Sequence, residues 1–252
     1  MSRTPSAPLA GWTLGEHRAG GIVHPTYRRG SGPGVIVVHE LPGITPTVVR
    51  FAEEVVDAGF TVVMPLLVGE AGRPPSAGYM AASAARLCVS REFTTMAVGR
   101  SSPVVAWLRA LARDLHASCG GPGVGAIGMC FSGGFALGMM LDDATVAPVL
   151  SQPSLPFAIG RRRAGDLGLD PDEAARVARR AADGCAVLGL RFDGDRLVGD
   201  RFESLARLLG GAFVAVEYPS SGPRDHSVLT EQRRDDAVRR VVAFLRERLA
   251  GA

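Results

Sequence analysis

The sequence of 252 residues contains no lysine, and all 28 of its basic side chains are arginines. These arginines are scattered and mostly interleaved with acidic residues, as in "EQRRDDAVRR", and the formal net charge is only +3. A surface that binds nucleic acid needs clustered basic residues with aromatic side chains among them. Aromatic residues make up only 6% of this chain. We therefore expect no nucleic-acid partner.

The sequence also lacks paired cysteines and long apolar runs. Its four cysteines, at positions 88, 119, 130 and 185, form no CxxC pair and have no metal-ligand spacing, so we expect neither a metal site nor a bound cofactor. No apolar run reaches 18 residues, and the first residues contain no apolar stretch typical of a signal peptide. We expect a cytoplasmic protein with reduced thiols and no membrane association.

Short apolar runs alternate with amphipathic segments along most of the chain. This alternation predicts an α/β fold with a mostly parallel sheet and helices on both faces. We expect residues 1–252 to form a single domain, because a chain of this length builds one sizeable core. The expected strands are 34–40, 60–65, 124–129, 145–152, 185–192 and 212–218, and the expected helices are 45–59, 101–116, 199–209 and 231–249.

Two segments depart from this alternation. Residues 12–32 combine alternating polarity with turn residues and predict a short antiparallel ribbon. Residues 153–184 are irregular and begin with a polar stretch, followed by a capped surface helix in "DPDEAARVARRAA". This second segment is either a lid beside the site or a solvated surface insert.

The most informative stretch is "GVGAIGMCFSGGFALGMM", residues 123–140. An apolar strand ends at Met129, a turn of small residues follows, and an apolar helix begins. A nucleophile at the tip of such a turn needs small residues two positions before and after it. Gly128 and Ser132 meet this requirement for Cys130. The helix N-terminus that follows favours a thiolate and an oxyanion.

The same motif allows other interpretations. Ser132 becomes the nucleophile if the motif is shifted by two residues, but the apolar run ends one residue before Cys130, which favours the cysteine. A buried cysteine that packs as a small apolar side chain, or a glycine-rich turn that holds phosphate, remains open from this motif alone.

Two later loops carry the residues that a catalytic thiol needs. Hydrolases of this topology place the nucleophile, an acid and a histidine in that order after successive strands. Asp193 and Asp195 follow the expected strand 185–192, and His226 lies between strand 212–218 and the last helix. The chain order therefore predicts a triad of Cys130, an aspartate and His226.

These motifs resemble the dienelactone hydrolase-like family of α/β hydrolases. The resemblance rests on "VIVVHELPG", "GAIGMCFSGG", "FDGDRLV" and "DHS", over roughly residues 30–250. It implies an α/β-hydrolase fold and a Cys–Asp–His triad of Cys130, Asp195 and His226. Asp195 matches the family's turn better than Asp193, which stays open as the triad acid.

The resemblance also assigns roles outside the triad. It implies that Glu40 lies beside the thiol and holds it unreactive until substrate arrives, and it makes Arg91 a candidate for binding a substrate carboxylate. Founding members also carry an arginine four residues after the histidine, where this chain has Thr230. From the chemistry, the backbone N–H groups of Leu41 and Phe131 should form the oxyanion hole.

The expected function is cysteine-dependent hydrolysis of an activated ester or lactone through a thioester acyl-enzyme. Two other classes remain: a cysteine protein that senses oxidation or processes glyoxals, and a non-catalytic ligand-binding member of the same fold. We expect a small-molecule ester or lactone as the partner, and a monomer or weak homodimer.

Overall fold

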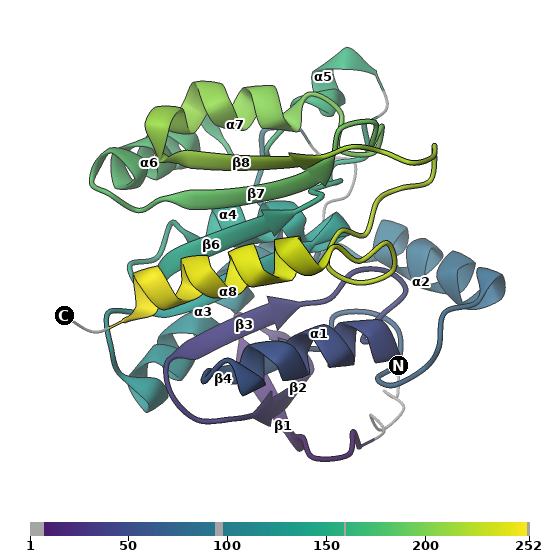
Figure 1. The fold of residues 1–252 in the computed structure, drawn as a ribbon, viewed down its shortest axis with the longest axis vertical. Helices are drawn as coiled ribbons and strands as arrows, with labels where there is room; N and C mark the ends of the chain where they lie inside the picture. Colours follow the sequence, from purple (N-terminus) through teal and green to yellow (C-terminus); the bar gives the residue numbers. More distant parts are fainter. Residues whose placement is uncertain (1–7, 94–97, 159, 251–252) are drawn as a thin grey trace.

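A computed structural model describes residues 8–93, 98–158 and 160–250. Eight strands form one sheet in the order β1-β2-β4-β3-β5-β6-β7-β8 (Figure 1). The strands are β1 Thr13–Ala19, β2 Ile22–Arg29, β3 Gly34–Val38, β4 Thr61–Pro65, β5 Val124–Met129, β6 Thr145–Ser151, β7 Val187–Phe192 and β8 Phe213–Tyr218. β1 and β2 pair antiparallel, as does β2 with β4, and all other pairs are parallel. The expected ribbon and parallel sheet are confirmed.

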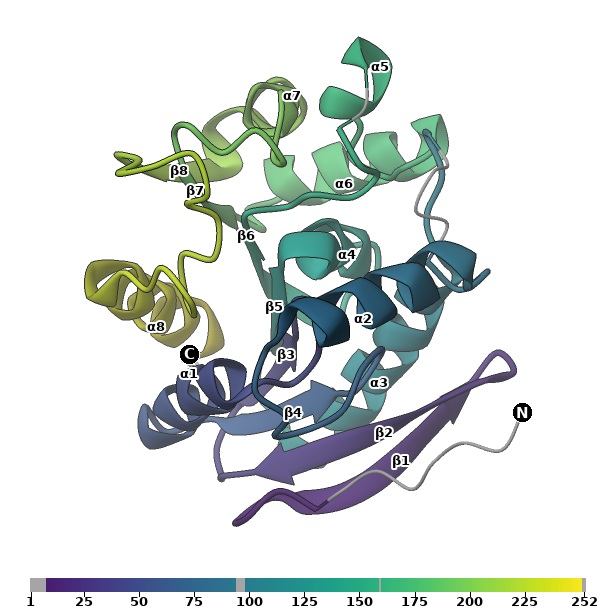
Figure 2. The same cartoon turned by 90° about the vertical axis from the view of Figure 1, so that its right-hand side faces the viewer.

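Helices cover both faces of the sheet (Figure 2). The helices are α1 Pro46–Asp57, α2 Ala77–Val89, α3 Pro103–Cys119, α4 Gly133–Met139, α5 Arg161–Ala164, α6 Pro171–Ala182, α7 Arg201–Leu209 and α8 Asp235–Leu249. One buried cluster joins apolar residues of α1 and α8 to the sheet. A second joins those of α3, α4, α6 and α7 to the opposite face. Alternate side chains of the strands are thus buried on both sides.

The central strands are almost entirely apolar, as a sheet covered on both faces requires. Every residue of β3, β4 and β5 is buried. The carboxyl ends of these parallel strands meet at one edge of the sheet, which is where ligands bind in open α/β sheets. Cys130 follows β5 directly at this edge.

Helix α2 was not expected from the sequence, where its residues fall in and after a loop rich in Gly, Pro and Ala. Ser76 caps the helix, and its hydroxyl accepts a hydrogen bond from the Tyr79 amide. Only three of its residues, Tyr79, Ser83 and Leu87, are buried. Its polar and apolar faces are therefore weakly separated, and helical periodicity gave little signal.

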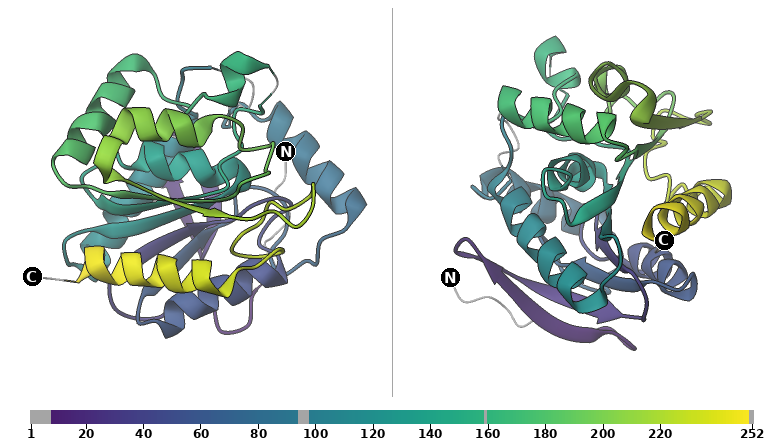
Figure 3. Two further views of the ribbon diagram at one scale, coloured as in Figure 1. Left: turned by 45° about the horizontal axis from the view of Figure 1, so that its top comes forward. Right: turned by 90° about the vertical axis from the view of Figure 1, so that its left-hand side faces the viewer.

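The segment 153–184 packs against the body of the protein for much of its length. Val177 and Ala181 of α6 are buried, and Arg176 and Arg180 donate hydrogen bonds to carbonyl groups between α4 and β6. α6 lies beside α7 on one side of the sheet (Figure 3). This part of the segment is therefore held to the protein by packing and by hydrogen bonds.

Candidate active site

Cys130 stands at the tip of a tight turn between β5 and α4. Its φ is +54°, a value that non-glycine residues rarely adopt and that stores strain. A side chain at Gly128 would lie 2.2 Å from the Ser132 carbonyl oxygen, so only glycine fits there. A side chain at Gly133 would lie 2.6 Å from Cα of Pro153. The small residues of the motif are thus required by close backbone approach.

Ser132, the rival nucleophile, is fully buried. Its hydroxyl oxygen accepts a hydrogen bond from the Met129 amide at 2.9 Å and lies 3.0 Å from the Val38 carbonyl oxygen. The hydroxyl group therefore joins the ends of β3 and β5. This placement favours Cys130 as the reactive side chain of the turn.

His226 and Asp195 meet beside this turn, from the loops that follow β8 and β7. Nδ1 of His226 lies 2.6 Å from Oδ2 of Asp195. Asp195 is only 8% exposed, and its other oxygen accepts a hydrogen bond from the Leu197 amide at 3.0 Å. The buried carboxylate thus fixes the ring orientation and leaves Nε2 as the free nitrogen.

Nε2 of His226 is buried and has no hydrogen-bond partner of standard geometry among the described residues. Burial alone would lower the pKa of His226. The interactions of the ring with Cys130, and then with Asp195, outweigh burial and raise this pKa to about 11. The imidazole ring of His226 is therefore protonated at neutral pH, beside the Cys130 side chain.

Asp193, the alternative acid, is exposed. It accepts a hydrogen bond from the Ser220 amide at 2.9 Å, and this bond lowers the pKa of its carboxyl group. Its role is to join the β7–α7 loop to the loop after β8. The structure pairs Asp195, not Asp193, with His226.

Glu40 is 3% exposed and lies in a cage of hydrogen-bond donors. Its carboxylate accepts from Nε2 of Gln152 at 3.1 Å, from the Ser227 hydroxyl at 2.8 Å and from the Thr230 hydroxyl. Burial raises the pKa of Glu40, although the hydrogen bonds from Thr230 and Ser227 oppose the shift. Through Ser227 the carboxylate ties the strand end after β3 to the loop of His226.

One hydrogen-bond partner of the thiol is Ser154, which the sequence analysis did not single out. Its hydroxyl oxygen lies 3.4 Å from Sγ of Cys130, and its amide donates to the Cys130 carbonyl at 3.1 Å. Ser154 is 3% exposed. No motif marks this residue, because only the packing of the chain after β6 against the turn brings it to the thiol.

The expected oxyanion-hole residues lie at the two neighbouring strand ends. Phe131 follows Cys130 in the turn, and Leu41 follows Glu40 after β3. The backbone carbonyl of Glu40 is held by His39, because Nδ1 of His39 lies 2.7 Å from this carbonyl oxygen. Nε2 of His39 accepts from the amides of Leu67 and Val68. Burial lowers the pKa of His39 to about 4, which keeps this ring neutral.

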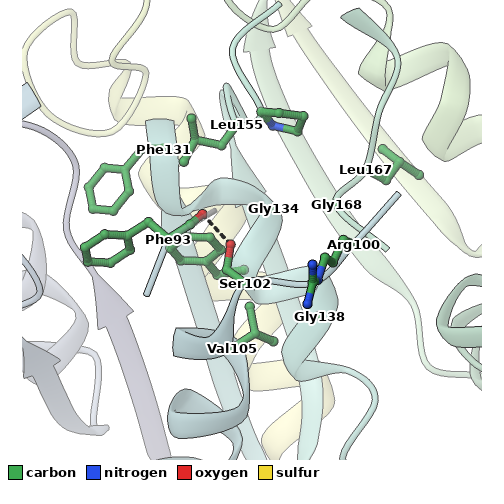
Figure 4. A pocket seen from close by; sticks show the side chains of 12 residues that line it. Phe93, Arg100, Ser102, Val105, Phe131, Gly134, Gly138, Leu155, Leu167 and Gly168 are labelled. Atoms are coloured by element: carbon green, nitrogen blue, oxygen red, sulfur yellow. Dashed lines mark hydrogen bonds between the residues drawn. The ribbon is translucent and has the colours of Figure 1, made fainter. Parts of the chain in front are cut away.

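Arg91 is exposed in the turn after α2, and no described contact joins it to the Cys130 or His226 side chains. A pocket beside α4 is lined instead by Arg100, together with Phe93 and Phe131 (Figure 4). The sequence offered no signal for Arg100, because the arginines of this chain are scattered. Within the described ranges, no cluster of His, Cys, Asp and Glu could hold a metal ion.

No helix in the described part of the chain combines the length and the apolar character that crossing a membrane would require. The search among curated proteins found no match to this sequence.

Solved structures with the same fold cover nearly the whole chain. A candidate dienelactone hydrolase from Klebsiella pneumoniae subsp. pneumoniae MGH 78578 is 18% identical, with a TM-score of 0.62 over 96% of this chain and 99% of its own. A dienelactone hydrolase-like promiscuous phosphotriesterase from metagenomic libraries is 17% identical, with a TM-score of 0.61 over 95% and 98%. A cold-adapted esterase from an Arctic intertidal metagenomic library is 15% identical, with a TM-score of 0.60 over 99% and 100%.

The sequence model of one family matches more than half of the chain. Residues 19–152 match the model of the dienelactone hydrolase family, a range that includes Glu40 and Cys130 but ends before Asp195 and His226. Together with the eight-stranded sheet and the turn at Cys130, this match shows that the chain belongs to the dienelactone hydrolase family and has the α/β-hydrolase fold.

Proposed function

We propose that this protein hydrolyses activated esters or lactones with Cys130 as the nucleophile. The observation that carries the proposal is the pair of His226 and Asp195, 2.6 Å apart, beside a strained cysteine at a helix N-terminus. A protein that only senses oxidation has no need of an oriented histidine. A relict binding site has no need of strain at the cysteine.

The reaction follows from the placement of these groups. The Cys130 thiolate attacks the carbonyl carbon, and the resulting oxyanion accepts hydrogen bonds from the Leu41 and Phe131 amides. The C–O bond then breaks, the leaving oxygen takes a proton from His226, and a thioester remains on Cys130. His226 next removes a proton from water, which attacks the thioester and releases the acid and the thiolate.

The nucleophile restricts the substrates. A thiolate leaves a tetrahedral intermediate more readily than an alkoxide does, so attack on an ordinary ester reverts. Esters and lactones with a good leaving group, such as enol lactones, react forward. We therefore place the substrate among activated esters and lactones.

Glu40 has a different role in this proposal from the one that the family resemblance implied. Its hydrogen bonds go to Gln152, Ser227 and Thr230, while the thiol has Ser154 as its partner. Glu40 therefore positions the loop that carries His226, and Ser154 holds the resting thiol.

The test compares four variants in the hydrolysis of p-nitrophenyl acetate. We expect Cys130→Ala and His226→Ala to abolish turnover, and Asp195→Asn to lower it by about 100-fold or more. Asp193→Asn is the matched control and should retain activity. Full activity in Cys130→Ala would refute a cysteine mechanism, and loss of activity in Asp193→Asn with full activity in Asp195→Asn would reverse the choice of acid.

A further inference from the structure

His39 is a fully buried histidine directly after β3 that takes no part in the proposed proton transfers. Its ring lies against backbone groups of two loops, the one after β3 and the one after β4. Nδ1 lies 2.7 Å from the Glu40 carbonyl oxygen. Nε2 lies 3.0 Å from the Leu67 amide nitrogen and 3.4 Å from that of Val68. Both ring nitrogens are therefore engaged with the backbone.

These partners determine which nitrogen of the ring carries the proton. A backbone amide only donates, so Nε2 must accept and carries no proton. A carbonyl oxygen only accepts, so Nδ1 must carry the proton and donate it to Glu40. Burial lowers the pKa of His39 to about 4, so the ring stays neutral at neutral pH. The ring is therefore a hydrogen-bond donor with one fixed direction.

The hydrogen bond from His39 holds the peptide group whose amide should bind the oxyanion. The Glu40 carbonyl and the Leu41 N–H belong to one planar peptide group, which is trans. The two point to opposite sides of the chain, so a bond that fixes the carbonyl also fixes the amide. Within the described ranges the Leu41 amide donates no hydrogen bond. It is therefore available to a substrate oxygen.

His39 also contacts the turn that carries the nucleophile. Its ring packs edge-on against that of Phe131, with the ring centroids 5.6 Å apart. The Ser132 hydroxyl oxygen lies 3.1 Å from the His39 carbonyl oxygen. Phe131 supplies the second amide of the proposed oxyanion hole. One buried residue thus contacts both strand ends that carry this hole.

We propose that His39 is the positioning residue of the oxyanion hole, an inference that rests on the proposed function. Its Nδ1–H holds the Glu40 carbonyl and thereby aims the Leu41 amide at the oxygen of the substrate carbonyl. Donors that are already in place stabilise an oxyanion strongly, because they need not reorient as the charge develops. In this role His39 acts through the backbone and transfers no proton.

The test separates ester hydrolysis, which forms an oxyanion, from alkylation of the same thiol, which does not. The kcat/KM for p-nitrophenyl acetate reports acylation of Cys130, whereas iodoacetamide loses iodide from a saturated carbon. His39→Gln keeps an acceptor for the amides after β4 but has no donor at the position of Nδ1. We expect its kcat/KM to fall by about ten-fold or more, as expected for a misplaced oxyanion-hole donor. Its rate of alkylation should stay near that of the wild type.

His39→Asn is the matched variant, because its side-chain amide lies near the position of Nδ1 and can donate to the Glu40 carbonyl. We expect its ratio of hydrolysis to alkylation to stay near the wild-type ratio. His116→Gln, in the last turn of α3, controls for the loss of a histidine and should change neither rate. Equal losses of hydrolysis and alkylation in His39→Gln, or equal ratios in the Gln and Asn variants, would overturn the positioning role.

A measurement on the wild type keeps the test decisive if neither His39 variant folds. Nitrogen NMR at neutral pH should show a neutral His39 ring with its proton on Nδ1, and a proton on Nε2 would overturn the proposal. A wild type that neither hydrolyses the ester nor gains an acetyl group would overturn the proposed function and the role of His39 with it. Full hydrolysis in both the wild type and His39→Gln would overturn the role of His39 alone.

Discussion

Two neighbouring strand ends carry the strain of this site. Cys130 after β5 and Gln152 after β6 are the non-glycine residues with positive φ in the described part of the chain, at +54° and +36°. Gln152 is fully buried and donates to Glu40, while the chain beyond it brings Ser154 to the thiol. Strain of this kind persists where surrounding contacts over-determine the backbone, and it gathers at functional sites.

Ser154→Ala should make the Cys130 thiolate less reactive. The variant loses the hydroxyl group that hydrogen-bonds to sulfur, and a hydrogen bond to a charged group contributes about 1.5–3 kcal/mol. We expect alkylation of Cys130 by iodoacetamide at neutral pH to slow by about ten-fold. Ser154→Thr keeps the hydroxyl and should alkylate close to the wild-type rate. Equal rates in wild type and Ser154→Ala would show that the serine does not support the thiolate.

His226 should stay charged far above neutral pH as long as Cys130 is present. Burial acts to lower its pKa, but the interactions with Cys130 and Asp195 outweigh burial and raise the pKa to about 11. The stabilisation from this charge is complete below about pH 6.5, the ordinary histidine pKa, and is lost as the pH rises towards 11. In Cys130→Ala, where only Asp195 opposes burial, we expect the pKa of His226 to fall. Titration of the ring followed by NMR measures both values, and an unchanged pKa in the variant would refute the pairing.

Chain order predicted the candidate residues of the site, but it did not predict which side chains they contact. Both aspartates after β7 satisfied the expected order, and only the 2.6 Å approach to His226 separates Asp195 from Asp193. Glu40 was expected beside the thiol, but its hydrogen bonds go to Gln152, Ser227 and Thr230. Such choices depend on side-chain directions in three dimensions, which residue spacing does not contain.

At the scale of elements, Arg201 at the start of α7 holds the irregular segment in place. Arg201 is 1% exposed, and its guanidinium group donates to carbonyls of Val198, Pro156 and Arg163. Burial lowers the pKa of Arg201 to about 10. One buried cation thus joins the start of the 153–184 segment and α5 to α7.

Arg201→Gln should destabilise the protein by about 2–4 kcal/mol, because hydrogen bonds from a charged group are lost and buried carbonyls are left without donors. Arg207→Gln on the same helix is the control. Arg207 bonds an exposed Ser204 hydroxyl, and surface changes stay within about 0.5 kcal/mol. Urea denaturation measures both free energies. Equal stability of the two variants would show that the segment is held by other contacts.

Elements with clear periodicity were predictable, and those without it were not. The strands β3 to β8 were predictable as short apolar runs, but α2 lies in an Ala-rich stretch with little amphipathic signal. The last helix begins at Asp235, four residues later than the expected 231. Gln232 there bonds the Ser227 and His226 amides, so residues before α8 shape the histidine loop instead of extending the helix.

At the scale of the whole molecule, the fold was the most predictable feature, because apolar strands alternating with helices allow few arrangements. The family model covers residues 19–152 and so includes the turn at Cys130. The two other residues of the proposed triad, Asp195 and His226, follow β7 and β8, outside this range, and they are supported by geometry alone. The central claim is therefore that two separately supported parts form one reactive site.

The measurement that tests this claim most directly is intact-protein mass spectrometry after brief mixing with p-nitrophenyl acetate. We predict that the wild type gains one acetyl group, mapped by digestion to Cys130, and that Cys130→Ala gains none. His226→Ala should acylate far more slowly, because it lacks the imidazolium that pairs with the thiolate. An acetyl group on Ser132 or Ser154 would contradict the cysteine mechanism. Turnover that leaves no adduct and that persists in Cys130→Ala would contradict it as well.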